Sequence, residues 1–84
     1  MIKILFFGRV REELGCGSLE LALAEETASL DKLQAQLCEQ GSEKWHAVLG
    51  QENIIRAVNQ SVTEGNIDLS DGDEVAFFPP VTGG

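Results

Sequence analysis

The residues best suited to chemistry end the chain, in the run Phe77-Phe78-Pro79-Pro80-Val81-Thr82-Gly83-Gly84. The two prolines cannot continue a sheet ladder, and they favour an extended backbone beyond them. The four residues after Pro80 reach at most about 13–14 Å, and the final glycines can enter a narrow channel because they have no side chains. The Gly84 carboxylate is therefore suited to activation, as an acyl phosphate or acyl adenylate, in another protein's active site. The alternative from these residues alone is a frayed terminus.

Other motifs do not support an active site within the chain itself. Gly15-Cys16-Gly17 lacks the third glycine of a dinucleotide-binding loop and precedes a predicted strand rather than a helix. The acidic segment 68–74 lacks the ligand spacing and the closing Glu of an EF-hand, so it is better interpreted as a turn. His46 is the single histidine, which leaves no zinc ligand set. We therefore expect a chain that binds no metal or cofactor and is not an enzyme by itself.

The charge balance bears on the class of partner. Six Lys and Arg against fourteen Asp and Glu give a formal net charge of −8, which argues against nucleic-acid and anionic-membrane partners. No apolar run approaches the roughly 20 residues that span a bilayer, and the first residues do not form a signal peptide. We expect a cytoplasmic protein in which Cys16 and Cys38 are free thiols.

Hydrophobic patterns predict four strands, at residues 2–7, 19–23, 54–58 and 74–78, with a short return strand at Val62 after a tight turn at Asn59-Gln60. Arg9 to Leu14 is too short for an independent helix. The glycines at 15 and 17 predict a sharp turn that joins the first two strands as an antiparallel hairpin.

One segment has a strong helical pattern. Four apolar side chains recur on one helical face, namely Leu30, Leu33, Leu37 and Cys38. Thr27 or Ser29 is the expected N-cap, and Gly41 is expected to end the helix in the left-handed conformation. Residues 42–49 predict a short second helical segment with Trp45 packed inward.

The order of elements predicts an α+β fold. A hairpin, one crossing helix and further strands form a mixed sheet packed on one main helix, which is the ubiquitin-like β-grasp. We expect a single β-grasp domain at residues 1–80 and a flexible Gly-Gly tail at residues 81–84.

Strand parity predicts a docking surface. Lys3 and Glu74 mark the solvent face of the first and last strands, and this places Phe7 and Phe78 on the same face. Exposed aromatic side chains in a small domain indicate a binding surface unless residues 9–14 cover them. We expect Phe7, Phe78 and Val62 to contact a partner, with Arg11 as a polar anchor at the rim.

Over essentially its full length, the sequence resembles the small sulfur-carrier subunits of molybdopterin synthase, a family of ubiquitin-like proteins. The resemblance lies in residues 1–12, in Ala57-Val58-Asn59-Gln60 and, most specifically, in the unbroken run from Leu69 to Gly84. Residues 40–53 depart most from the family pattern.

The resemblance implies a cycle of sulfur transfer. A separate adenylating enzyme would use ATP to activate Gly84, and sulfur would then replace the adenylate to give a thiocarboxylate. The tail at residues 81–84 would insert into the large subunit, within a heterotetramer of two subunits of each kind. Pro79, Pro80, Val81 and Thr82 would contact the partner, and Gly83 and Gly84 would reach its active site. There the sulfur would attack cyclic pyranopterin monophosphate and build the molybdopterin dithiolene.

Three alternative functions are also compatible with these residues. The same tail would serve a sulfur carrier for thiamine thiazole synthesis or tRNA thiolation. A protein modifier would instead join Gly84 to a lysine by an isopeptide bond. A β-grasp interaction module with an inert tail would be unaffected by the loss of Gly83 and Gly84.

Overall fold

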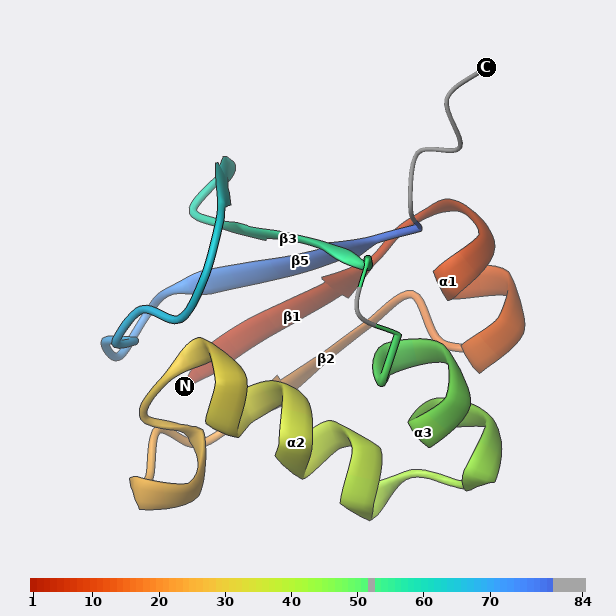
Figure 1. Ribbon diagram of the computed structural model, residues 1–84. Coiled ribbons are helices and arrows are strands. Elements are labelled where there is room, and N and C mark those ends of the chain that lie inside the picture. The colour runs from red at the N-terminus through yellow and green to blue at the C-terminus, as the bar shows by residue number, and fades with distance from the viewer. Residues whose placement is uncertain (52, 80–84) are drawn as a thin grey trace.

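The computed structural model describes residues 1–51 and 53–79, and it arranges them as a five-stranded sheet with helices (Figure 1). The elements in chain order are β1 (Ile2–Phe6), α1 (Gly8–Leu14), β2 (Ser18–Leu21), the 3-10 helix η1 (Glu25–Thr27), α2 (Leu30–Gln40), α3 (Glu43–Leu49), β3 (Ile55–Val58), β4 (Ser61–Thr63) and β5 (Glu74–Phe78). Within the described part of the chain, every helix is too short or too polar to cross a membrane.

The sheet is mixed, with strand order β2-β1-β5-β3-β4. The first strand pairs antiparallel with β2 and parallel with β5, whereas β3 pairs antiparallel with both β5 and β4. The final strand therefore lies in the middle of the sheet, and the chain leaves it beside the end of β1. This confirms the predicted α+β architecture and the antiparallel pairing of the first two strands.

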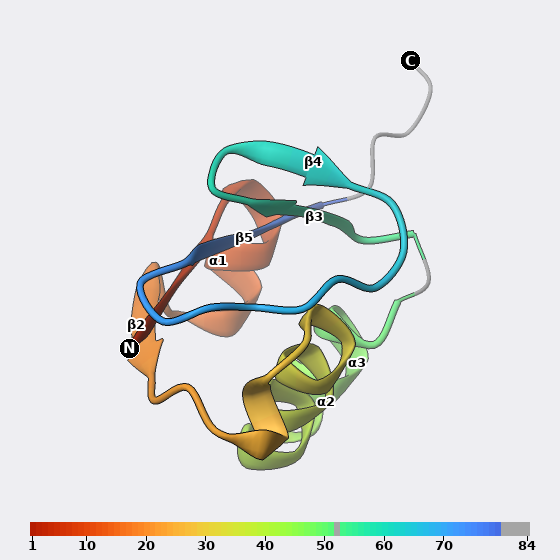
Figure 2. The same cartoon turned by 90° about the vertical axis from the view of Figure 1, so that its left-hand side faces the viewer.

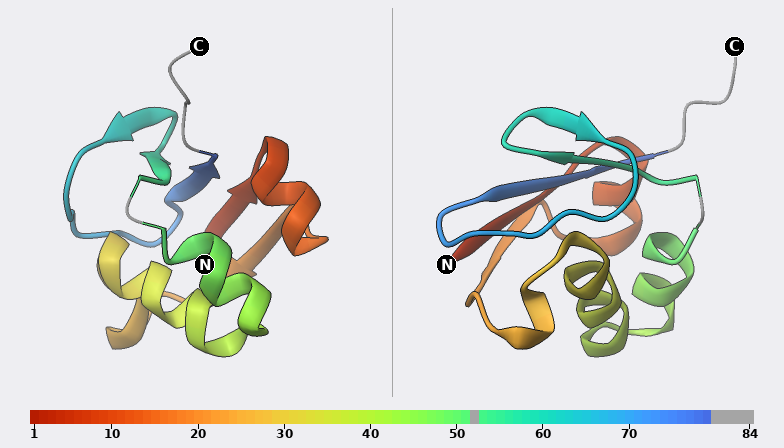
Figure 3. Two further views of the ribbon diagram at one scale, coloured as in Figure 1. Left: turned by 45° about the vertical axis from the view of Figure 1, so that its right-hand side comes forward. Right: turned by 60° about the vertical axis from the view of Figure 1, so that its left-hand side comes forward.

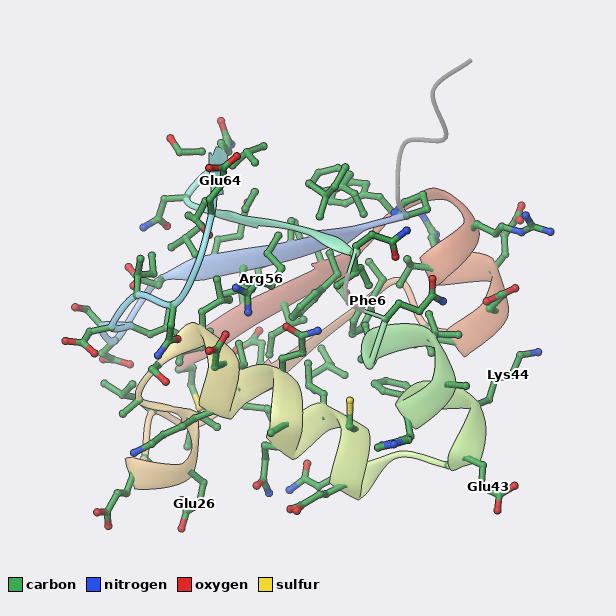
Figure 4. The ribbon with its side chains drawn as sticks, viewed as in Figure 1. Phe6, Glu26, Glu43, Lys44, Arg56 and Glu64 are labelled. Carbon is green, nitrogen blue, oxygen red and sulfur yellow. The ribbon has the colours of Figure 1, made fainter. Side chains whose placement is uncertain are left out.

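The core lies between one face of the sheet and the helices. Figures 1 and 3 show α2 and α3 against this face, and Figure 2 shows the β3–β4 hairpin on the side away from them. Ile2, Ile4 and Phe6 point into the core and are at most 1% exposed, as the two-residue repeat predicts. Phe6 lies beside α3 in Figure 4. Its ring packs edge-on against Trp45 of α3, with a centroid distance of 5.4 Å.

The main helix begins as expected, because the Ser29 side chain accepts a hydrogen bond from the Lys32 backbone N–H. The helix ends at Gly41 as expected, but the predicted conformation is wrong, since Gly41 is extended (φ −85°, ψ −177°) rather than left-handed. Glycine fits here for a different reason. A Cβ at this position would lie 2.7 Å from Cδ2 of Trp45 and closer still to its Cβ and Cγ.

The structure also corrects the prediction for the segment that connects β1 and β2. The sequence predicts only a glycine turn there, but residues 8–14 form the helix α1, in which Val10 and Leu14 are buried. Seven residues do not form a stable helix alone, so burial of these two side chains in the shared core stabilises it. Gly15 then ends α1 in the left-handed conformation, at φ +65°.

Candidate functional site

The candidate site begins where β5 ends. Phe78 is the last residue of β5 and Pro79 follows it, while Pro80, Val81, Thr82, Gly83 and Gly84 lie outside the described residues. Because β5 runs parallel to β1, Pro79 lies at the same end of the sheet as Phe7. A backbone hydrogen bond of 3.1 Å from Phe7 N–H to Phe77 C=O joins the two strands at this end.

Gly8 makes room for Pro79. A Cβ on Gly8 would lie 3.3 Å from Cγ of Pro79, and the glycine backbone has a positive φ of +56°. A larger residue would be strained at this φ and would press on the proline ring. The start of α1 therefore forms one wall of the place from which the tail begins.

Phe7 and Phe78 form the aromatic part of the site. Their rings stack with a centroid distance of 4.8 Å and an interplanar angle of 7°. Phe7 is 40% exposed and Phe78 is half-buried, so α1 does not cover the pair. The predicted common face of these two side chains is therefore present in the structure, while their contact with a partner stays a prediction.

Val62 joins the same surface from the β3–β4 hairpin. It is 68% exposed and lies opposite Ala57 in the register of the sheet. Together with Phe7 and Phe78 it lines one hollow of about 390 Å³, and with Phe78 and Pro79 it lines another of about 380 Å³. We name the exposed residues Phe7 and Val62, together with the half-buried Phe78 and Pro79, the apolar patch.

Arg11 lies apart from the apolar patch. It is exposed on α1, and its Nε is 3.0 Å from the point where a Cβ of Gly17 would be. It lines a separate hollow of about 560 Å³ with Gly8 and Cys16 among its neighbours. Gly8 connects this hollow to Pro79, and the predicted anchoring role of Arg11 stays untested.

Several residues on this face were not among the sequence-based candidates. Further residues that line the two hollows are Leu5, Ile55, Ala57, Gln60, Glu74 and Ala76. Strand parity already places Glu74 and Ala76 on the face of Phe78. Parity likewise places Leu5 on the face of Phe7. Ile55 and Ala57 required the register between β3 and β5, which sets Ala57 opposite Ala76 and Ile55 opposite Phe78.

The titratable groups do not assemble a catalytic centre in the part of the chain that the structure describes. No cluster of three or more His, Cys, Asp or Glu side chains there is suited to hold a metal ion. Burial, with a smaller contribution from Glu39, raises the pKa of the Cys38 thiol, so this cysteine is a poor nucleophile. Cys16 is also free, and its thiol donates to the Ser18 carbonyl at 3.3 Å.

One carboxylate has a lowered pKa for a structural reason. Asp73 accepts a hydrogen bond of 3.0 Å from the Asn59 side chain and another of 2.8 Å from the Ser70 backbone N–H. These two donors stabilise the ionised form and lower the pKa of Asp73. The carboxylate closes the turn before β5 and thereby fixes the start of the strand that leads to the candidate site.

Comparison with known proteins gives a consistent result across the length of the chain. Residues 4–84 match the ThiS family, so the match includes Gly83 and Gly84. The molybdopterin synthase sulfur carrier subunit of Escherichia coli (strain K12) is 43% identical over 84 residues, which are 100% of both chains. The subunit with the same name from Haemophilus influenzae is 34% identical over 84 residues, again 100% of both chains.

Two solved structures resemble the fold. A complex of subunits 1 and 2 of molybdopterin-converting factor from Helicobacter pylori contains a chain with 27% identity and a TM-score of 0.69, covering 99% of this chain and 97% of that one. SAMP1 from Haloferax volcanii has a TM-score of 0.78 over 99% of this chain and 98% of that chain. Its identity is 22%, so this second likeness bears on the fold alone.

Proposed function

The chain belongs to the ThiS family, and from that membership we propose that it is the sulfur-carrier subunit of a molybdopterin synthase. The observation that carries the proposal is the 43% identity to a molybdopterin synthase sulfur carrier subunit over the whole of both chains. The matched region includes the terminal glycines, which are the residues that this chemistry requires.

The cycle begins with activation of Gly84. A carboxylate oxygen of Gly84 attacks the α-phosphorus of ATP on a separate activating enzyme, which releases pyrophosphate and leaves an acyl adenylate. Hydrosulfide then attacks the acyl carbon and displaces AMP, which leaves a thiocarboxylate. Like a thiolate, the thiocarboxylate is ionised at neutral pH and is a soft nucleophile. The ATP is consumed by the activating enzyme, and the carrier itself binds no cofactor.

The thiocarboxylate then delivers its sulfur on the large subunit. Its sulfur attacks a side-chain carbon of cyclic pyranopterin monophosphate and displaces an oxygen substituent from that carbon. Water then hydrolyses the resulting thioester, which leaves the sulfur on the pterin and restores the Gly84 carboxylate. A dithiolene contains two sulfur atoms, so two charged carriers are consumed for each molecule of product. The carrier is a substrate-bearing subunit of a transferase rather than an enzyme by itself, in an assembly with two copies of each subunit.

The apolar patch is the proposed docking surface, with Pro80, Val81 and Thr82 leading Gly83 and Gly84 into the partner's active site. Three observations support this. Phe7 and Val62 of the patch are exposed, the patch includes Pro79 at the end of β5, and a structural relative is named in complex with its second subunit. The net charge of −8 favours a cationic partner and speeds the encounter by long-range attraction.

Intact-mass measurement tests the proposal. The chain is purified after expression with, and without, the activating enzyme and a sulfur source. We expect a gain of about 16 Da on Gly84, the difference between oxygen and sulfur, only when both are present. An unchanged mass under both conditions would contradict a sulfur carrier. A mass increased by that of a second protein would instead identify a modifier.

Two variants make the mass measurement specific to the tail. Deletion of Gly83 and Gly84 should abolish the gain. The double substitution Cys16→Ser and Cys38→Ser should leave the gain intact, because a persulfide on a cysteine adds about 32 Da rather than about 16 Da. A gain that disappears with the cysteines would place the sulfur on a side chain and overturn the proposal.

A further inference from the structure

The exposed face of the sheet contains a groove with a floor of two alanines. Ala76 of β5 lies opposite Leu5 of β1 on one side and opposite Ala57 of β3 on the other. Ala57 in turn lies opposite Val62 of β4. Because an alanine side chain is a single methyl group, this row is lower than its neighbours. The four residues line the hollow of about 390 Å³ described above.

The two sides of the groove differ in polarity. The stacked rings of Phe7 and Phe78 form one side, and Glu74 and Gln60 line the other. Alternate residues of a strand are about 6.5–7 Å apart, so Glu74 and Phe78 flank Ala76 at this spacing on either side. An extended lysine or arginine side chain spans the distance from Ala76 to Glu74.

Glu74 is held in place by its backbone. Its C=O accepts a hydrogen bond of 2.7 Å from Asn59 N–H, and its own N–H donates to Asn59 Oδ1 at 3.0 Å. The carboxylate is different, since no ion pair or side-chain hydrogen bond engages it within residues 1–51 and 53–79. Lys3 lies opposite Glu74 in the sheet register without forming an ion pair with it there.

We propose that this groove receives a lysine or arginine side chain of the docking protein, with its aliphatic stem on Ala57 and Ala76 and its charged end at Glu74. The inference rests on the proposed function, because it takes the large subunit of the synthase as that protein. A purely apolar side chain fits less well, since it would remove water from the Glu74 carboxylate without replacing its hydrogen bonds. Long basic side chains combine an apolar stem with a charged end and satisfy both sides of the groove.

The substitution Glu74→Gln tests the charged contact. Binding of the full chain to the purified large subunit is measured by calorimetry at about 0.05 M and about 0.5 M salt. We expect Glu74→Gln to weaken binding about tenfold at low salt and to reduce the salt dependence of the affinity. Glu26→Gln on η1 makes the same change in net charge away from the sheet face (Figure 4), and it should bind within about twofold of wild type. Equal binding by these two variants would overturn the proposal.

The substitution Ala76→Leu tests the groove itself. Leucine makes the face more apolar but fills the space above the floor. We expect binding to fall at least about tenfold, whereas generic apolar contact would keep or increase the affinity. Since leucine at this position can also disturb the sheet, Glu74→Gln decides the proposal alone if Ala76→Leu unfolds.

Different results would overturn the groove assignment and the carrier function. A wild-type chain that gains about 16 Da on Gly84, while Glu74→Gln binds like wild type, would overturn the groove assignment and leave the carrier function standing. A wild-type chain that does not bind the large subunit would overturn both.

Discussion

The rings of Phe7 and Phe78 lie nearly parallel, 4.8 Å apart, although one residue follows the first strand and the other ends the last strand. A stacked aromatic pair contributes about 0.5–1.5 kcal/mol beyond the burial of its surface. The stack also fixes the backbone immediately before Pro79. The apolar patch and residue Pro79 are thereby held in one arrangement.

We expect Phe78→Glu to weaken binding to the large subunit by at least about tenfold, because it places an uncompensated charge at the centre of the apolar patch. The domain should remain folded, since Phe78 is only half-buried. Calorimetric affinity and thermal unfolding are measured on the same preparation. Leu23→Glu is the matched control, because Leu23 is 38% exposed and follows β2, away from the apolar patch. Equal affinity of the two variants would exclude the patch as the docking surface.

The close approach of Trp45 to Gly41 leads to a prediction about stability. Gly41→Ala should lower the free energy of unfolding by about 1–3 kcal/mol, because the added methyl group forces the indole from its place beside Phe6. The backbone angles at Gly41 suit any residue, so the cost comes from the contact alone. Chemical denaturation of Gly41→Ala, Trp45→Ala and the double variant measures the coupling. Additive losses would show that the two positions do not interact.

Much of this architecture could be predicted because it depends on local repeats. Burial of Ile2 and Ile4 and exposure of Phe7 follow from the two-residue period of a strand. Asn59 and Gln60, with φ of +50° and +69°, form the tight turn that their residue types indicate.

Features that depend on contacts between distant segments could not be predicted in the same way. Helix α1 exists because Val10 and Leu14 reach the core, and the extended Gly41 reflects the position of Trp45. The alanine floor of the groove could not be predicted, because it depends on the register of β3 against β5. More than ten residues separate these two strands in the chain. Sequence alone therefore predicted the common face of Phe7 and Phe78 but not the alanine floor between β5 and β3.

The lowered pKa of Asp73 predicts a dependence of stability on acidity. Because the folded-state pKa lies below the unfolded value of about 3.9, Asp73 stabilises the fold fully above that value. The contribution is lost as the pH falls through the folded-state pKa. Asp73→Asn should therefore lower stability at neutral pH and make the loss of stability on acidification smaller than in wild type. Denaturation at a series of pH values, with Glu26→Gln as the charge-matched control, measures the effect. Identical pH profiles for the two variants would contradict it.

Arg56 connects β3 to α2 and to the loop at Gly65. Its guanidinium donates to Asp31 Oδ1 at 2.6 Å and to Gln34 Oε1 at 3.0 Å on α2, and to the Gly65 carbonyl at 2.9 Å. The side chain is 14% exposed and points from the sheet toward α2 (Figure 4).

Arg56→Met should lower the free energy of unfolding by about 1–3 kcal/mol, because a mostly buried guanidinium with three acceptors is worth more than an exposed ion pair. Arg56→Lys should recover little of this, since one ammonium group cannot reproduce the planar fork. Asp31→Asn should cost less than Arg56→Met, because Asp31 is 60% exposed and the contacts to Gln34 and Gly65 remain. Denaturation of the three variants measures the order. A lysine variant as stable as wild type would show that charge alone, rather than the forked geometry, joins β3 to α2.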